Sequence, residues 1–342
     1  MGFVSFFTDV STEMILGILP IFIVSELGAT KAILGLIEGG AEALSHAFRA
    51  FSGIISDRIG RRKALVFIGY ALSTVSKPFF AVARVWTDAL FIRVGDRVGK
   101  GVRTSPRDAL LSESVGAKQT GMAFGIHRSL DQAGAIVGPV LAFTLIPLMG
   151  FRDIFWLSFM PGAVAVAILL VFVRERAVRP KSVGVFKNVG DVLRGRFILL
   201  LVIIGVFSIG AFNFSFILIR AEDLGVAAGF IPLVYVVINI AHTAVGIPAG
   251  TLADRIGKER VLMLGYASFF LAALLGMSLT GNPLYAYLIA AVYGVYIGIA
   301  ETVQRALIPD YSRSESRGTA YGLYYLTVGA CFFIANSLFG AL

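Results

Sequence analysis

Charged residues are scarce in this sequence of 342 residues. Asp, Glu, Lys and Arg make up 15% of it, against about a quarter of an average soluble protein. Cysteine is almost absent as well: Cys331 stands alone, and one cysteine forms neither an internal disulfide nor a cysteine-ligated metal centre. No nucleophile and base stand at a spacing typical of an enzyme. We therefore expect neither a soluble enzyme nor a disulfide-stabilised domain, and we expect no cofactor.

The abundant residues are apolar. Hydrophobic residues make up 57% of the chain, and the mean hydropathy is +0.83. Apolar stretches of about 20 residues recur along the whole length, and each is long enough to span a bilayer. The pattern predicts an all-α polytopic integral membrane protein with eleven spans, near residues 3–25, 32–56, 64–82, 88–112, 119–147, 153–173, 197–219, 228–252, 261–280, 283–307 and 317–342.

Lysine and arginine are distributed unevenly between the loops. The loop after the second span alone holds Arg58, Arg61, Arg62 and Lys63, whereas the loops on the opposite side together hold Lys31, Arg84, Arg152 and Arg220. Basic loops stay in the cytoplasm, so we expect the amino terminus to be cytoplasmic and the chain to lie in the cell membrane. The net charge of +9 then reflects membrane topology, and we do not expect nucleic-acid binding.

The chain contains an internal repeat. The basic stretch Gly53–Lys63 has a near copy in Gly250–Arg260, and the two copies are 197 residues apart. The segments Gly121–Gly125 and Gly318–Gly322 keep the same distance. Internal repeats are typical of secondary transporters.

The repeat divides the chain into two predicted domains. We predict an N-terminal six-helix bundle over residues 1–173, a cytoplasmic linker over 174–196 and a C-terminal bundle over 197–342. The sixth span has no counterpart in the second repeat. We therefore expect a twelfth helix that is missing from this sequence.

The repeated stretch resembles the loop signature of the major facilitator superfamily, G-x-x-x-D-R-x-G-R-R. The first copy fits this signature in full, through Gly53, Asp57, Arg58, Gly60, Arg61 and Arg62. The second copy fits it through Gly250, Asp254, Arg255 and Gly257, but Glu259 replaces a basic residue.

Two further motifs add to the resemblance. Arg93 fits the basic residue of the family's fourth-helix motif. Gly134, Gly138 and Pro139 fit its fifth-helix motif G-x-x-x-G-P, which the family associates with antiporters, although the usual further glycines do not follow.

This resemblance covers essentially the whole chain and implies both fold and function. The fold implied is two six-helix bundles, with the last helix absent here. The function implied is secondary active transport by alternating access, and our preferred version is proton-coupled export of a small organic molecule by a monomer. Two alternatives stay open: uptake of an anionic metabolite, and a non-transporting membrane sensor or scaffold.

Asp57 suggests how such a transporter could close. The eleventh span starts on the cytoplasmic side, so its amino terminus lies on the same face as Asp57. An acid near the positive end of a helix dipole is stabilised by about 0.3–1 kcal/mol when exposed. We expect Asp57 to act as a conformational latch there; the alternative is that the loop is only a topological anchor.

The first two spans carry acids at positions where charge is costly. Asp9 and Glu13 are four residues apart, as are Glu38, Glu42 and His46, so each set lies on one helix face. Carboxylates within a membrane are functional candidates, and we expect these acids to carry protons. Divalent-metal transport and plain structural pairing with Arg49 are the alternatives.

The fourth span carries bases on one side of the helix. About a third of the circumference holds five bases, Arg93, Arg97, Lys100, Arg103 and Arg107, with Asp96 beside them. Such a row could bind an anionic group of the substrate, or Asp96 and Asp131 could simply neutralise it. The stretch Ser-Pro-Arg-Asp that begins at Ser105 resembles the start of a new helix. In that case the membrane helix would end near Arg103.

Two observations concern the rest of the chain. Arg128 and Asp131 are three residues apart and could pair with each other. The second repeat holds few charges and many aromatic residues, so we expect the first half to handle charge and the second to offer an aromatic wall.

Overall fold

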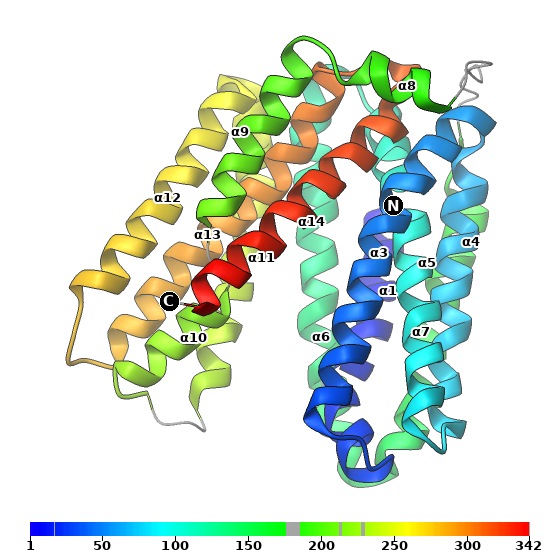
Figure 1. Cartoon of the computed structure of the whole chain (residues 1–342), viewed down its shortest axis with the longest axis vertical. Helices are drawn as coiled ribbons and strands as arrows, with labels where there is room; N and C mark the ends of the chain where they lie inside the picture. The colour runs from blue at the N-terminus through cyan, green and yellow to red at the C-terminus, as the bar shows by residue number, and fades with distance from the viewer. Residues whose placement is uncertain (17, 176–184, 212–213, 227–229, 342) are drawn as a thin grey trace. The chain divides into compact units, whose positions relative to one another are not determined.

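The computed structural model describes residues 1–16, 18–175, 185–211, 214–226 and 230–341. Every regular element in these ranges is helical, which confirms the predicted all-α class. Figure 1 shows the path of the chain. Its helices fall into two compact units that are interleaved along the sequence. The predicted domain boundaries at residues 173 and 197 stay a prediction, and residues 176–184 of the predicted linker lie outside the described residues.

Unit 1 comprises Met1–Ser114, Ala133–Leu193 and Ser312–Leu326. Its helices are α1 (Gly2–Leu16), α2 (Leu19–Ile21) with the π turn Phe22–Glu26, α3 (Lys31–Ile59), α4 (Arg62–Ser76) with the 3-10 turn Lys77–Val82, α5 (Trp86–Ser114), α7 (Phe159–Phe172), α8 (Val185–Val192) and a 3-10 turn at Ser314–Ser316. The helices α3 and α4 both pack along α5, and α7 packs against α1 and α4.

Unit 2 comprises Val115–Gln132, Arg194–Tyr311 and Thr327–Leu342. Its helices are α9 (Arg196–Gly210), α10 (Phe214–Asp223), α11 (Ile231–Ile256), α12 (Lys258–Ser278) and α13 (Leu284–Leu307), with 3-10 turns at Ala117–Gln119 and Ile308–Asp310. The helices α11 and α12 pack along α13. Two helices, α6 (Thr120–Leu157) and α14 (Arg317–Ala341), contribute residues to both units.

The helices agree in position with the predicted spans. Within the described residues, five segments are by themselves long and apolar enough to cross a membrane: Arg62–Val82, Thr144–Phe172, Leu233–Ile256, Lys258–Ser278 and Leu284–Asp310. The number of spans therefore stays a prediction, although the helices are consistent with it.

Glycines with a positive φ end the repeated elements at equivalent points. Gly28 and Gly225 adopt φ values of 66° and 89°, and Gly60 and Gly257 adopt 67° and 105°. A side chain is strained in this backbone conformation, so glycine is the residue that fits each turn. Gly150, with φ 77°, breaks α6 between the predicted fifth and sixth spans.

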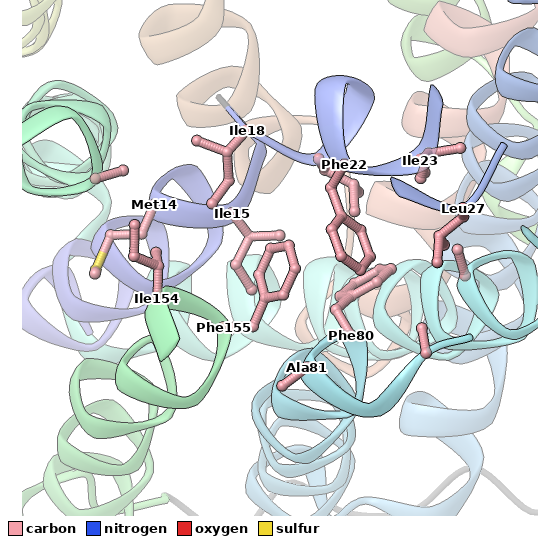
Figure 2. Packing of buried hydrophobic residues seen from close by; sticks show 14 of the residues in the cluster. Met14, Ile15, Ile18, Phe22, Ile23, Leu27, Phe80, Ala81, Ile154 and Phe155 are labelled. Atoms are coloured by element: carbon pink, nitrogen blue, oxygen red, sulfur yellow. The ribbon is translucent and has the colours of Figure 1, made fainter. Parts of the chain in front are cut away.

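A cluster of buried hydrophobic residues that includes three phenylalanines forms a core of unit 1 (Figure 2). The ring of Phe155 meets the rings of Phe22 and Phe80, at centroid distances of 4.9 and 5.6 Å. Unit 2 has its own aromatic core, in which Phe207 stacks on Tyr266 at 3.6 Å. Part of the predicted aromatic wall is thus packed inside unit 2.

Candidate functional site

The first copy of the repeated motif lies where α3 turns into α4. Gly60 ends α3, and its N–H donates to the Ser56 carbonyl at 2.9 Å. Arg58 and Arg61 are exposed beside the turn, whereas Arg62 is buried. The Arg62 guanidinium donates to Asp57 at 3.0 Å and pairs with Glu113.

The buried carboxylate of Asp57 accepts hydrogen bonds from the start of α14. The donors are the Gly318 N–H at 3.0 Å, the Thr319 N–H at 2.6 Å and the Thr319 hydroxyl at 2.8 Å. Burial raises the pKa of the Asp57 carboxyl, while Arg62 and the bonds from α14 act in the opposite direction. The expected contact between Asp57 and the helix amino terminus is present in the structure.

The second copy makes the equivalent contact within unit 2. Asp254 accepts from the N–H groups of Gly121 at 2.9 Å and Met122 at 2.8 Å, at the start of α6. Arg255 is exposed, and Gly257 supplies the turn that follows. Each unit therefore holds one acid of the repeated motif on the first turn of a helix.

Glycines bring these helices into close contact. A Cβ atom at Gly53 would collide with the Gly318 carbonyl oxygen, and one at Gly250 would collide with the Gly121 carbonyl oxygen. Glycine at these two positions lets the helix backbones approach closely beside the acids.

The glycines of the fifth-helix motif face α1 in unit 1. A Cβ atom at Gly138 would lie 2.8 Å from the Val10 oxygen and 2.8 Å from the Glu13 Cβ. One at Gly134 would collide with the Phe6 carbonyl oxygen. Pro139 follows within α6. These glycines let the α6 backbone approach the acids of α1.

Arg93 lies at the centre of a polar network in unit 1. Its guanidinium donates to Glu38 at 2.6 Å and to Asp96 at 3.2 Å. Asp96 also accepts from the Ser73 hydroxyl at 2.6 Å. The predicted neutralisation of Arg93 by Asp96 is present, and α3, α4 and α5 are joined through it.

Glu42 forms the second centre of this network. One carboxylate oxygen lies 3.4 Å from Arg49 and 3.5 Å from His46, and the other lies 3.4 Å from Arg97. Lys100 also acts on Glu42 electrostatically. The structural pairing with Arg49 that the sequence left open is therefore formed.

Lys77 is a member of the network that the sequence reasoning missed. It is 1% exposed, and its ammonium donates to the Ser11 hydroxyl at 3.1 Å. Asp9, Glu13 and Asp96 all act on it electrostatically. A lysine within the apolar stretch 64–82 is the signal that could have found it.

The network brings acids and bases together and exposes only some of them. Its members are five acids and six bases: Asp9, Glu13, Glu38, Glu42 and Asp96, and Arg49, Lys77, Arg93, Arg97, Lys100 and Arg103. The side chains of Glu38 and Glu42 are 36% and 40% exposed, whereas that of Arg93 is 2% exposed. The two glutamates are therefore more accessible than Arg93.

Arg128 and Asp131 lie in unit 2, in a second charged cluster. Arg128 pairs with Asp131, as their spacing indicates, and also with Glu301 of α13. Arg305 lies 3.4 Å from Glu301. The prediction that the first half of the chain handles charge stays a prediction, and unit 2 holds an ion pair that joins Arg128 of that half to Glu301 of the second half.

One alternative from the sequence does not fit the structure, and another gains no support from the described residues. The helix α5 runs unbroken through Pro106, and the Ser105 hydroxyl donates to the Arg49 carbonyl at 2.7 Å instead of capping a new helix. Among the described residues, no three His, Cys, Asp or Glu side chains gather as a metal site requires. The network in unit 1 is therefore an arrangement of ion pairs along a continuous α5.

Comparisons with known proteins agree with this architecture. The model of the Major Facilitator Superfamily matches residues 1–336. An uncharacterised MFS-type transporter of Methanocaldococcus jannaschii is 34% identical over 100% of this chain and 87% of its own length. The multidrug resistance protein MdtG of Proteus mirabilis is 26% identical over 81% of this chain and 71% of its own. The E. coli fucose:proton symporter FucP has a TM-score of 0.79 at 16% identity, over 99% of this chain and 90% of its own, and is similar in fold.

Proposed function

Because the chain belongs to the major facilitator superfamily, it is a membrane transporter, and we propose that it exports a small organic molecule in exchange for protons. Relatives named as multidrug resistance proteins support export. The fifth-helix motif of Gly134, Gly138 and Pro139 supports antiport. The uneven distribution of lysine and arginine supports a place in the cell membrane with a cytoplasmic amino terminus. The proposed working form is a monomer.

One observation carries the proton-coupled version of this proposal. Glu38 and Glu42 are partly exposed, yet each is held by buried arginines. A proton on Glu42 would remove the charge that holds Arg49 and Arg97 at 3.4 Å. Proton binding would thus loosen α3 from α5, which gives the two protonation states different preferred structures.

The repeated motif is proposed to work as the latch of alternating access. The acids of its two copies cap helix amino termini, and the surrounding glycines admit the close approach. These capping bonds need the helices in contact, so opening must break them. The residues assigned to this role are Gly53, Asp57, Arg58, Gly60, Arg61, Arg62, Gly250, Asp254, Arg255 and Gly257.

The test separates proton coupling from substrate binding. A thermal-shift screen of cationic, neutral and anionic organic molecules on the purified protein first identifies a ligand. Flux of that ligand in proteoliposomes is then measured with a pH gradient and as exchange at equal pH. We expect Glu42→Gln to abolish gradient-driven flux and to keep exchange, because the amide mimics the protonated acid. We expect the same of Glu13→Gln.

Asp153→Asn is the matched control. Asp153 is an exposed acid of unit 1 outside the network, so this variant should keep both activities. Loss of ligand affinity in Glu42→Gln, with affinity kept in Arg93→Ala, would contradict the assignment and favour a cationic substrate at the acids.

Uptake of an anionic metabolite is the second candidate, and Arg97 favours it. Its Nε atom lies 3.4 Å from Glu42, whereas its Nη1 atom is buried and makes no hydrogen bond to the described residues, so Nη1 is available to an anionic group. In that case Arg97→Ala should weaken binding of the anionic members of the screen, and lysine should rescue only partly because it lacks the planar fork.

A further inference from the structure

His242 occupies an unusual position in α11 of unit 2. Its side chain is buried, with 3% of the residue exposed, and its Nε2 atom makes no hydrogen bond within the described residues. The Gln132 amide donates to Asn239 at 2.6 Å, and the Ser129 hydroxyl donates to the Thr243 carbonyl at 2.8 Å. These bonds join α6 to α11 on both sides of His242. A buried ring nitrogen held at such a place without a partner calls for an explanation.

Charged groups from two helices act electrostatically on His242. Arg128 and Asp131 come from α6, and Glu301 and Arg305 come from α13. Arg128 pairs with both acids, while Arg305 lies 3.4 Å from Glu301. Glu301 also acts electrostatically on Tyr293 of its own helix.

The charges of this cluster cancel when the imidazole is neutral. Two carboxylates then face two guanidinium groups. Withdrawing Arg128 would leave an excess negative charge on buried Asp131 and on Glu301, whose side chain is 34% exposed, and an uncompensated charge at such a site is costly. His242 is the neutral base at hand that can restore the balance by taking up a proton.

We propose that His242 and Glu301 form a proton-binding site in unit 2, and that the position of Arg128 decides whether the site is filled. When Arg128 leaves, a proton from water adds to the lone pair of the unprotonated ring nitrogen, and the imidazolium faces Glu301. When Arg128 returns, that proton is released to water. This inference rests on the proposed exchange for protons and adds a second site to the network of unit 1.

The place of Arg128 in the fold gives the site its dependence on conformation. Residues 120–132 of α6 belong to unit 2, and residues 133–157 belong to unit 1. Arg128 therefore lies on a helix shared by both units, four residues before the change from one unit to the other. A coupling site needs proton affinities that differ between conformations, and a cation on a shared helix provides that difference.

The test uses protons as the probe and needs no substrate. The chain has three histidines, so histidine-selective 15N NMR of the purified protein in lipid nanodiscs resolves the titration of each ring. We expect Arg128→Gln to raise the proton affinity of His242 by about tenfold or more, because one of the two opposing cations is gone. Arg128→Lys keeps the positive charge and should change the proton affinity of His242 less.

A second variant should act with the opposite sign. Glu301→Gln removes the facing carboxylate, so the proton affinity of His242 should fall, and this arm decides the question if Arg128→Gln does not fold. Arg260→Gln, at an exposed position of unit 2, is the matched control and should leave the titration unchanged.

Identical titration midpoints in wild type, Arg128→Gln and Glu301→Gln would overturn the proposal. Because the titration contains neither substrate nor gradient, its result does not depend on whether export is the correct direction. Once a ligand is known, His242→Gln should reduce gradient-driven flux and keep exchange at equal pH. Unchanged gradient-driven flux in that variant would show that the site is not part of coupling.

Discussion

The two copies of the repeated motif make the same contact with different surroundings. Asp57 in unit 1 and Asp254 in unit 2 each accept hydrogen bonds from two successive backbone N–H groups at the start of a helix. Asp57 also accepts from the Thr319 hydroxyl and pairs with buried Arg62. For Asp254 the equivalent positions hold Met122, whose side chain cannot donate a hydrogen bond, and Glu259, which is not a base.

This difference separates what the motif needs from what strengthens it. The backbone bonds are common to both copies and require only an acid and a helix amino terminus. The side-chain bonds are confined to the first copy, where Asp57 is 3% exposed and desolvated. Bonds to a buried charge are stronger than bonds to an exposed one, so we expect the contact in unit 1 to be the stronger of the two.

Replacing the two acids should give the largest difference between the copies. Asp57→Asn leaves the buried Arg62 without this partner and should weaken the contact by about 3–5 kcal/mol. Asp254→Asn loses only bonds from N–H groups and should cost about 1.5–3 kcal/mol. Spin-label distances between α3 and α14, and between α11 and α6, would report each opening. Cys331→Ser provides the cysteine-free background, because the chain has one cysteine.

The distance distributions decide between a latch and an anchor. A latch predicts that Asp57→Asn populates longer α3–α14 distances and that Asp254→Asn populates longer α11–α6 distances to a smaller extent. Unchanged distributions in both variants would mean that the motif is only a topological anchor. Equal shifts would mean that the side-chain bonds of Asp57 add nothing.

The glycines opposite these acids should show no such difference between the copies. Gly53→Ala and Gly250→Ala would each press a Cβ atom into a backbone oxygen, which rigid helices cannot avoid. We expect both to lower stability by about 1–3 kcal/mol, measured as a fall in melting temperature. Gly40→Ala is the control, since no heavy atom lies within 4 Å of its Cβ and alanine favours a helix. A harmless Gly250→Ala would show that unit 2 is loosely closed.

Much of the fold could be predicted from the sequence. Apolar stretches of spanning length locate helices whatever their neighbours, and the repeat distance of 197 residues places Gly60 and Gly257 in equivalent turns. The contact between Asp57 and α14 could also be predicted, because a helix amino terminus attracts an acid and the predicted topology places both on the cytoplasmic side. The interleaving of the two units could not be predicted, since the sequence of residues 120–132 does not indicate which helices they pack against.

The polar clusters were predicted only in part. Glu42 and Arg93 could be identified from the sequence, because a charged side chain within a membrane span is costly at any position. Lys77 was overlooked beside the more numerous acids, and the pairing of Arg128 with Glu301 joins residues far apart in the sequence. Charge, burial and helix face can be read from a sequence, but partners from distant helices require the packed structure.

The smallest expected effect tests whether the extra hydroxyl accounts for part of the difference between the copies. Thr319→Val removes the hydroxyl bond to Asp57 and keeps the shape and the backbone bond, so it should weaken the contact by about 1–2 kcal/mol. Met122→Thr offers Asp254 the same hydroxyl at the equivalent position and should strengthen the α6–α11 contact by less than about 1 kcal/mol, because that site is more exposed. The same spin-label distances measure both changes, which should have opposite signs. In an Asp57→Asn background, Thr319→Val should have almost no further effect, since its partner is already altered. A full additional loss there would assign the effect of Thr319 to helix packing instead of to its bond with Asp57.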